Sequence, residues 1–463
     1  MAAAHPALHI VILAAGQGTR MRSRLPKVLQ PLGGQPLLAH VLERARDCHP
    51  TQISIVVGHQ AEQVQARFPD PDLRFVLQAE QRGTGHAVAL ALEQQPPDSQ
   101  VLVLYGDVPL LAPLDIQRCL QSNAPLTLLT ADIPDPTGYG RILLGPEGQV
   151  LAIVEEREAD AATRQIQRIN TGILTARAAD LLRWLPQAEA KAQQEGHEWY
   201  LTDVVALAHA EGLRVEAVLS ADANTALGVN HPLQLATQER LLQRQRATAC
   251  LQQGLQLADP ERFDLRGTLT FGQDCRMDVN CLCEGEVVLG HDVSIGPGCV
   301  LRNVRIGDHV VIAAYSVLES CEIGNGCHVG PYARLRPGTV LDEQARIGNF
   351  VEVKNSHLHN GAKVNHLSYI GDAEIGARSN VGAGTITCNY DGVNKHRTQI
   401  GEGAFIGSNT ALVAPVSVGA GATIGAGSVI TRTAPAHALT LTRAEQITRL
   451  DWQSPQLRSK AKS

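Results

Sequence analysis

Aromatic residues are scarce in this sequence, and long apolar runs are absent. Phe, Trp and Tyr make up 3% of the 463 residues, which predicts a core built largely from smaller aliphatic side chains. No apolar run approaches the ~18 residues that a membrane-spanning helix needs. The N-terminal MAAAHPALH lacks the basic start and the apolar stretch of a signal peptide. We therefore expect a cytoplasmic protein without membrane insertion.

The sequence also lacks a strong excess of one charge. The formal net charge is −6 and both signs are mixed along the chain, which argues against nucleic acid as the main partner. The ten cysteines are expected to be free thiols in a cytoplasmic chain of this length. Cys275, Cys281 and Cys283 lack the two-residue spacing of zinc sites, so we do not interpret them as metal ligands.

The first half contains a regular alternation of apolar strands and amphipathic segments. Short aliphatic runs occur at 8–14, 53–57 and 101–105, as in strands buried on both faces of a sheet. Between them, residues 37–46 and 86–94 repeat apolar side chains at helical spacing. Strands separated by helices in this order predict an α/β fold with a mostly parallel, Rossmann-like sheet.

The rest of the chain contains a helical stretch and then a repeat. Residues 232–257 are rich in Gln, Arg and Leu, and Pro232 suits a first helical turn. Beyond them, aliphatic residues recur every six positions, a period that fits neither an α-helix nor an alternating strand. This period predicts a parallel β-helix with one aliphatic side chain at each inward corner. The repeat is clearest at Ile323, Val329, Leu335, Leu341, Ile347 and Val353, and at Ile400, Ile406, Leu412, Val418, Ile424 and Ile430.

These patterns divide the chain into three segments. We predict an α/β domain at 1–231, a helical connector at 232–257, and a β-helix domain with a C-terminal tail at 258–463. The six-residue spacing is interrupted at 359–369 and at 387–399. Interruptions of a solenoid form surface loops, and such loops often carry function. We therefore predict a site in this part of the β-helix.

Glycines and cations follow the first predicted strand. The string is Leu13, Ala14, Ala15, Gly16, Gln17, Gly18, Thr19, Arg20 and Met21, with Lys27 soon after. Glycines after a strand let backbone N–H groups approach a polyphosphate, and Arg20 and Lys27 supply fixed positive charge. The two glycines alone would equally suit a tight turn, and their spacing fits neither a dinucleotide site nor a P-loop.

The complete string resembles the signature of nucleoside-diphosphate-sugar pyrophosphorylases. Asp107 ends an apolar strand, at the sheet edge where α/β proteins bind ligands. Asp107 and Asn230 supply one carboxylate and one amide oxygen, which suit Mg²⁺ because this ion keeps water and substrate phosphate as its other ligands. Further matching motifs follow in the family's order: Gln78–Gln81, Gly83–His86, Tyr105–Asp107, Gly138–Arg141, Glu155, Asn170–Gly172 and Gly228–Asn230.

This resemblance implies uridylyl transfer from UTP to a sugar 1-phosphate, with release of pyrophosphate. Arg20 would act as the catalytic cation beside Lys27 and the metal. Gln78 and Gly83 would contact the uracil, while Gly140, Glu155 and Asn170 would contact the sugar. The implied nucleotide and sugar set is Leu13, Ala14, Ala15, Gly16, Lys27, Gln78, Gly83, Thr84, Tyr105, Gly106, Asp107, Gly140, Glu155, Asn170 and Asn230.

Polar residues gather in the interrupted part of the β-helix, and three interpretations besides an active site remain. His357, His359 and His366 could bind a metal, as in β-helical carbonic anhydrases, although their spacing does not favour it. The β-helix could be a structural arm on a monofunctional pyrophosphorylase, although an arm has no use for so many polar groups. A non-catalytic scaffold would leave the motifs of the first domain unexplained.

The strings NHLSYIGD (365–372) and GAGTITCNYDG (382–392) carry a second resemblance. Over roughly residues 8–450 the chain is similar to the bacterial bifunctional N-acetylglucosamine-1-phosphate uridyltransferase/glucosamine-1-phosphate acetyltransferase family. The resemblance implies a left-handed β-helix, a homotrimer, Mg²⁺ as cofactor, and UTP and acetyl-CoA as co-substrates. Glucosamine 1-phosphate would be acetylated first and N-acetylglucosamine 1-phosphate then uridylylated, which supplies UDP-N-acetylglucosamine for peptidoglycan and lipopolysaccharide.

The same resemblance implies the residue roles in acetyl transfer. His366 would be the general base, because an imidazole suits proton transfer near neutral pH. Asn389 would either orient His366 or stabilise the oxyanion. The sugar phosphate would be held by Arg336 and Lys354, with Tyr369 and Asn380 on the sugar. The implied acetyl-CoA groove consists of Ala383, Asn389, Tyr390, Ser408, Ala426 and Arg443.

Overall fold

The computed structural model describes residues 7–93 and 95–456. It falls into two compact units, Met1–Leu242 and Gln243–Ser463, and the division lies within helix α7, Pro232–Gln252. Residues 457–463, which end the predicted tail, lie outside the described part. Among the described residues, no helix is long and apolar enough to cross a membrane.

The first unit is built on a mixed sheet whose centre is parallel. The strand order is β11-β7-β10-β6-β1-β4-β5, with β1, β4, β5 and β6 parallel and β10 antiparallel to both of its neighbours. The predicted strands at 8–14, 53–57 and 101–105 correspond to β1, β4 and β6, and the α/β prediction is confirmed. The strands are β1 Leu8–Leu13, β4 Gln52–Val57, β5 Leu73–Leu77, β6 Gln100–Tyr105, β7 Leu126–Asp132, β8 Arg141–Leu144, β9 Val150–Val154, β10 Arg168–Arg177 and β11 Val215–Leu219, with a small hairpin of β2 Pro31–Leu32 and β3 Gln35–Pro36.

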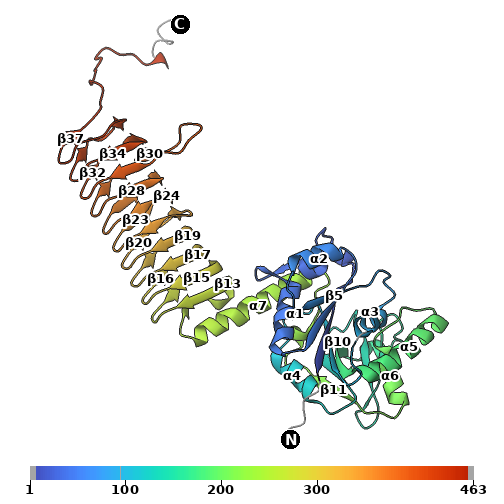
Figure 1. Ribbon diagram of the computed structural model, residues 1–463. Coiled ribbons are helices and arrows are strands. Elements are labelled where there is room, and N and C mark those ends of the chain that lie inside the picture. The colour runs from blue at the N-terminus through green and yellow to red at the C-terminus, as the bar shows by residue number, and fades with distance from the viewer. Residues whose placement is uncertain (1–6, 94, 457–463) are drawn as a thin grey trace. The chain divides into compact units, whose positions relative to one another are not determined.

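Helices cover both faces of this sheet, because alternate residues of each central strand point to opposite sides. Ile10 and Ile12 of β1 pack into a core with α1 and α4, whereas Val11 packs into a second core with α3, α5 and α6. Each core residue of β1 is fully buried. The helices, several of them labelled in Figure 1, are α1 Leu37–Asp47, α2 Ala61–Arg67, α3 Thr84–Leu92, α4 Pro113–Gln121, α5 Ala178–Glu195 and α6 Asp203–Ala210.

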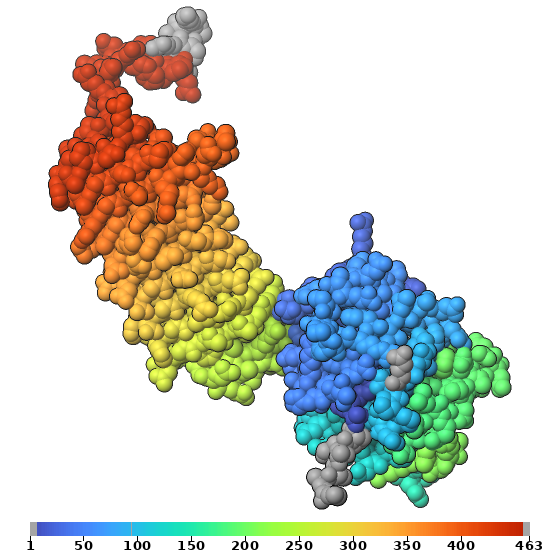
Figure 2. All heavy atoms as spheres, in the orientation of Figure 1, coloured from blue at the N-terminus to red at the C-terminus, as the bar shows by residue number. Residues whose placement is uncertain are grey.

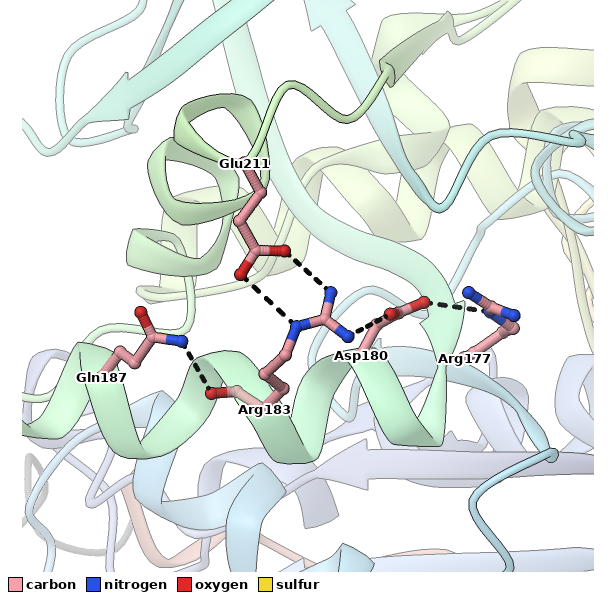
Figure 3. A network of polar contacts seen from close by, with 5 residues as sticks. All are labelled: Arg177, Asp180, Arg183, Gln187 and Glu211. Atoms are coloured by element: carbon pink, nitrogen blue, oxygen red, sulfur yellow. Dashed lines mark hydrogen bonds and ion pairs between the residues drawn. The ribbon is translucent and has the colours of Figure 1, made fainter.

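A network of charged side chains ties α5 to the end of α6 (Figure 3). The Asp180 carboxylate is almost fully buried in the first turn of α5, where the helix dipole favours a negative charge. It accepts hydrogen bonds from Arg177 at 3.0 Å and from Arg183 at 2.9 Å. Arg183 also donates to both carboxylate oxygens of Glu211, which caps α6. This network holds the segment between the two helices, which contributes to the cavity described below.

The second unit is a parallel β-helix with three faces. Strands pair with the equivalent strand of the next coil, as in Leu341↔Leu358, Ile347↔Val364 and Val353↔Ile370. These aliphatic side chains are buried inside the coils, so the predicted hexapeptide β-helix is confirmed. Figure 1 shows the strands stacked from β13 to β37. In the first coils, four long strands each span two faces: β13 Phe263–Phe271, β15 Cys281–Leu289, β17 Val300–Ile306 and β19 Val317–Ile323.

Each of the three faces of the β-helix is a column of parallel strands. The first face is β12 Gln256–Leu257, β14 Arg276–Met277, β16 Ser294–Ile295, β18 Val311–Ile312, β20 His328–Val329, β23 Arg346–Asn349, β26 Lys363–His366, β29 Asn380–Val381, β32 Phe405–Ile406, β35 Thr423–Ile424 and β37 Leu439–Thr440. The second face, beyond the long strands, is β21 Arg334–Leu335, β24 Glu352–Lys354, β27 Tyr369–Gly371, β30 Ile386–Cys388, β33 Ala411–Val413 and β36 Val429–Ile430. The third face is β22 Val340–Leu341, β25 His357–Leu358, β28 Ala373–Ile375, β31 Thr398–Ile400 and β34 Val416–Val418.

The two predicted interruptions of the repeat have different outcomes. The interruption at 359–369 is wrong, because β25, β26 and β27 continue the coil in register with the coil before it. The turn from β24 to β25 is one residue shorter than the six-residue repeat, since Leu358 comes five positions after Val353, and this shifts the spacing without opening a loop. The interruption at 387–399 is a real excursion between β30 and β31, with Val393 83% exposed near its tip. This loop leaves the coil beside β30 in Figure 1 and stands out from the surface in Figure 2.

Two candidate active sites

The first candidate site is a cavity of about 490 Å³ at the carboxyl ends of β1 and β6. Gly106 does not line it, because this glycine packs against Val28 and the carbonyl of Leu13. Glu198 and Tyr139 line it as well, although neither was predicted as a site residue. The predicted residues that do line the cavity are Leu13, Ala14, Ala15, Gly16, Arg20, Lys27, Gln78, Gly83, Thr84, Tyr105, Asp107, Gly140, Glu155, Asn170 and Asn230.

Charged and amide groups converge at one end of this cavity. The Lys27 ammonium group contacts the Asp107 carboxylate and lies 3.1 Å from the amide oxygen of Asn230. Arg20 donates to the same Asn230 oxygen at 3.0 Å. The oxygens of Asp107 and Asn230 thus face one common cation, the Lys27 ammonium group. Two hard oxygen donors around one cation fit the ligand preference of Mg²⁺.

A buried amide and a strained turn form another wall of the cavity. Gln78 is 4% exposed and donates from Nε2 to the carbonyl of Gly83 at 2.9 Å. Gly83 has φ 124°, a conformation that side-chain-bearing residues rarely adopt. A Cβ atom at this position would lie 2.3 Å from the carbonyl oxygen of Trp199. Only glycine therefore fits at the point where the turn meets the Trp199 segment.

A half-buried carboxylate, Glu155, lies beneath Gly140 in the same cavity. A Cβ atom on Gly140 would approach both Glu155 carboxylate oxygens to 3.4 Å. Thr202 donates a hydrogen bond of 2.9 Å to Glu155 Oε1. Burial raises the pKa of Glu155, while the bond from Thr202 opposes this shift. Thr202 was missed by the sequence reasoning, because nothing in the spacing connects it to a glutamate so far away in the chain.

The second candidate site surrounds His366, an exposed residue at the end of β26. Its Nδ1 lies 3.1 Å from Oδ1 of Asn349, the residue paired with it on the previous coil. An amide oxygen can only accept, so Nδ1 donates this hydrogen bond, and in the neutral imidazole the lone pair is then on Nε2. His366 and Asn349 both line a surface hollow of about 520 Å³ on the first face. Asn349 was also missed by the sequence reasoning.

The predicted acetyl-CoA residues continue the column of His366. Val364, Val381, Ile406 and Ile424 are paired from coil to coil. The residues two positions beyond them therefore stack in the same order: His366, Ala383, Ser408 and Ala426. Arg443 follows β37 on the next coil, with its guanidinium near Gly425. Tyr390 lies in the protruding loop and is 61% exposed.

The predicted sugar-phosphate residues are divided between two corners of the coil. Arg336 and Lys354 follow the paired residues Leu335 and Val353, at the corner where the second face ends, whereas His366 ends a strand of the first face. The Arg336 guanidinium donates to Glu352 at 2.9 Å. Asn380 pairs with Lys363 on the first face, whereas Tyr369 begins β27 between the two corners.

Asn389 belongs to the corner of Lys354 and not to that of His366. It is buried and donates from Nδ2 to the Asp372 carboxylate, which also accepts from Asn355. Burial works to raise the pKa of Asp372, but the hydrogen bonds from Asn355 and Asn389 lower it overall. Within one chain, Asn349 thus contacts His366 and Asn389 does not. The hollow that His366 and Asn349 line does not include Arg336 or Lys354.

The fold and these two clusters define a nucleotidyltransferase domain joined to a hexapeptide-repeat transferase domain. Matches to family models agree with this division. Residues 10–195 match the MobA-like NTP transferase domain, 265–349 match the GMPPB C-terminal domain, and 397–432 match six repeats of the bacterial transferase hexapeptide.

Full-length relatives identify the family. The chain is 53% identical over 450 residues to the bifunctional protein GlmU of Alkalilimnicola ehrlichii, covering 97% of each chain. It is 53% identical to that of Stutzerimonas stutzeri over 97% of this chain and 99% of the relative. For Acidithiobacillus ferrooxidans the identity is 54%, over 96% and 98%. The chain belongs to the family of bifunctional GlmU proteins, and it is a bifunctional transferase with uridyltransferase and acetyltransferase domains.

Proposed function

We propose that the chain makes UDP-N-acetylglucosamine in two steps at its two candidate sites, in the cytoplasm. The acetyl group of acetyl-CoA passes to the 2-amino group of glucosamine 1-phosphate, with release of CoA. The uridylyl group of UTP then passes to N-acetylglucosamine 1-phosphate, with release of pyrophosphate. The observation that carries the second step is that the oxygens of Asp107 and Asn230 both face the Lys27 ammonium group inside the cavity of the first unit.

In the uridylyl step, a phosphate oxygen of the sugar 1-phosphate attacks the α-phosphorus of UTP and the bond to pyrophosphate breaks. Arg20 and Lys27 neutralise the phosphates and hold them in line, and such positioning and charge stabilisation dominate this class of reaction. Mg²⁺ held by Asp107 and Asn230 would supply further charge neutralisation on the phosphates. Gln78, fixed by its bond to Gly83, hydrogen-bonds the uracil edge. Glu155 accepts from a sugar hydroxyl.

In the acetyl step, Nε2 of His366 takes a proton from the 2-amino group as its nitrogen attacks the thioester carbon. The bond from Nδ1 to Asn349 supports this role, because it leaves Nε2 as the free base. The column of Ala383, Ser408 and Ala426 offers small side chains beside His366, so an extended acyl-CoA arm can lie along the coils. CoA leaves as the thiol after the tetrahedral intermediate collapses.

We further propose a homotrimer in which neighbouring β-helices complete each acetyl site. The separation of His366 from Arg336 and Lys354 within one chain supports this, since a sugar phosphate must reach all three. A ladder of exposed apolar side chains beside the His366 column also supports it, because such surfaces mark protein contacts. The ladder is Tyr315, Tyr332, Phe350 and Leu367, each between 50% and 62% exposed, with the three aromatic rings stacked.

Two assays on the purified full chain test this proposal. Free CoA thiol is measured with acetyl-CoA and glucosamine 1-phosphate, and pyrophosphate is measured with UTP and N-acetylglucosamine 1-phosphate. We expect His366→Ala to lower CoA release by about 10²–10⁴-fold and to leave pyrophosphate release intact. Asp107→Ala should show the reverse pattern. Equal loss of both activities in either folded variant would contradict two separate sites. A folded wild type that releases no CoA would favour the alternative in which the β-helix is a purely structural arm.

A further inference from the structure

Two histidines and two acids meet on the third face of the β-helix, away from the His366 column. Val340, His357 and Glu374 pair from coil to coil, which places Asp342 beside the residue two positions after His357, namely His359. The four polar side chains thus come from three successive coils. Each is between 31% and 44% exposed, so the cluster is reachable from solvent.

The distances within this cluster are those of a potential metal site. Asp342 Oδ1 lies 2.7 Å from His357 Nε2, and Asp342 Oδ2 lies 2.9 Å from His359 Nδ1. One ligand atom from each of these residues lies within 4.8 Å of the others, and no other group of three such ligands occurs in the described part of the chain. In a tetrahedral site with bonds of about 2.0–2.1 Å, ligand atoms lie about 3.3 Å apart. Small side-chain shifts would therefore admit an ion.

Glu374 contacts the far side of His359. Its Oε1 lies 3.1 Å from Nε2, while Nδ1 of the same ring faces Asp342. A carboxylate on the second nitrogen of a metal-ligating histidine fixes its tautomer and strengthens it as a ligand. Without an ion, both nitrogens of His359 face groups that can only accept, so both must carry protons. Burial lowers the pKa of His359, but the bonds to Glu374 and Asp342 outweigh it and raise the pKa overall.

We propose that Asp342, His357 and His359 bind a divalent transition-metal ion of the Zn²⁺ class, with Glu374 orienting His359 and water as the remaining ligand. The ion takes the place of the proton on His359 Nδ1, which is released to solvent, and His357 binds through Nε2 as a neutral imidazole with its proton on Nδ1. Two imidazoles favour Zn²⁺, Co²⁺ or Ni²⁺ over Mg²⁺, which prefers oxygen ligands. The ion would join two successive coils of the third face, a site separate from both transfer reactions.

The ligands of this proposed site differ from the three histidines that the sequence suggested as a possible metal site. A metal site from His357, His359 and His366 would have to join two faces of the coil. His366 instead lies on the first face against Asn349, and Asp342 stands as the third ligand. Asp342 could not be found from sequence spacing alone, because its proximity depends on the number of residues in one coil.

Titration of the chelator-treated full chain with Co²⁺ tests the proposal, with visible absorption reporting nitrogen coordination and Zn²⁺ added as competitor. The Asp107→Ala chain is used throughout, so that an ion at the nucleotide site is not counted. We expect one Co²⁺ per chain, displaced by Zn²⁺ in the presence of excess Mg²⁺. Glu374→Gln should weaken binding by about 10–100-fold, as loss of such supporting carboxylates does.

The decisive variant is His357→Ala/His359→Ala, which should lose the Co²⁺ spectrum. His309→Ala is the matched control, since His309 contacts Asp292 on the neighbouring coil at 3.0 Å and lies outside the cluster. It should bind Co²⁺ as the parent does. If the double variant does not fold, judged by circular dichroism, the single variant His359→Gln replaces it. Undiminished Co²⁺ binding by folded His357→Ala/His359→Ala or His359→Gln protein, or no stoichiometric binding by the parent, would overturn the proposal.

Discussion

Asn349 and His366 stand one above the other on neighbouring coils, with the amide oxygen of Asn349 3.1 Å from Nδ1 of His366. The contact lies on the first face, where β23 and β26 are paired at three positions, the last of which joins Asn349 to His366. In the proposed acetyl step this contact makes Asn349 an orienting residue, which holds the imidazole through Nδ1 and leaves Nε2 free. Asn389, the residue expected near His366, is instead buried against Asp372.

Changing Asn349 to aspartate should alter the pH dependence of acetyl transfer. A carboxylate at this position favours the protonated imidazole, so less of the enzyme holds a free base at a given acidic pH. We expect the acidic limb of kcat/KM to move up by about one pH unit. The measurement is CoA release as a function of pH. Asn349→Leu, which removes the acceptor, should lower kcat about tenfold or more at every pH.

Pyrophosphate release serves as the internal control for both Asn349 variants. It should keep its rate and its pH profile, because the contacts of Asn349 lie within the β-helix. An Asn349→Asp enzyme whose acetyl-transfer profile matches that of the wild type would show that this contact has no influence on the base.

The bond from Thr202 to Glu155 leads to a second prediction, for the sugar 1-phosphate. In the proposed uridylyl step Glu155 accepts a hydrogen bond from a sugar hydroxyl, for which it must be a carboxylate, and burial already raises its pKa. Removing the hydrogen bond in Thr202→Val raises the pKa further, so protonation begins at a higher pH. We expect KM for N-acetylglucosamine 1-phosphate to rise as the pH falls, and to stand roughly fivefold above the wild type at acidic pH.

Thr202→Ser is the matched control for this second prediction, because it keeps the hydroxyl group. It should behave as the wild type does, with little change in kcat for either variant. If KM for the sugar phosphate had the same pH dependence in all three enzymes, Glu155 would not be the group that binds the sugar hydroxyl.

A third prediction concerns Gly83 and its contact with the Trp199 segment. Gly83→Ala places a methyl group against the Trp199 carbonyl and also imposes a left-handed conformation on alanine. We expect KM for UTP to rise at least tenfold, because the turn that holds Gln78 must move. The free energy of unfolding should fall by more than the roughly 1–2 kcal/mol of backbone strain alone.

Gly148→Ala separates strain from collision in this third prediction. Gly148 has φ 77°, but no atom lies within 4 Å of a Cβ built on it. This variant should lose about 1–2 kcal/mol of stability and keep its KM for UTP. Equal effects of the two substitutions on stability and on KM would contradict a specific role for the Trp199 contact.

The parts of the fold that the sequence predicts are those in which a local pattern of apolar residues corresponds to side chains buried in the core. The central residues of β1, β4 and β6 are buried in the sheet, and the six-residue spacing follows from the inward corners of each coil. The predicted break at 359–369 was wrong for a related reason. Coils of the β-helix vary in length, and the turn between the second and third faces is one residue shorter here, so Leu358 comes five positions after Val353 and yet lies in the same interior.

The site residues that the sequence did not reveal depend on distances along the chain that no local pattern encodes. Asn349 reaches His366 only because one coil here contains 17 residues, as their hydrogen bond across that separation shows. Thr202 reaches Glu155 from a segment held by the network of α5 and α6. Asp342 joins His357 and His359 through the same coil stacking. Motif resemblance can find residues within a string, but these partners stand outside the strings.

The last prediction concerns stability and rests on His9, a buried residue of β1. Burial, with a smaller contribution from Arg74, lowers its pKa from 6.5 to about 4. Between these values the unfolded chain binds a proton that the folded chain does not. The resulting stability is complete above pH 6.5 and is lost as the pH falls toward 4. Between pH 7 and pH 5 we expect the first unit to lose about 2 kcal/mol from this residue.

His9→Gln isolates this contribution, because an amide can keep the hydrogen bond of 2.9 Å to Ser54 without titrating. Urea unfolding at pH 7 and pH 5 is followed by tryptophan fluorescence, which reports the first unit through the buried Trp184 and Trp199. Since carboxylates elsewhere also titrate, the informative quantity is the difference between the two proteins. The wild type should lose about 2 kcal/mol more than His9→Gln between the two pH values. Equal losses would mean that the folded chain protonates His9 as readily as the unfolded chain does, which would contradict the lowered pKa of this residue.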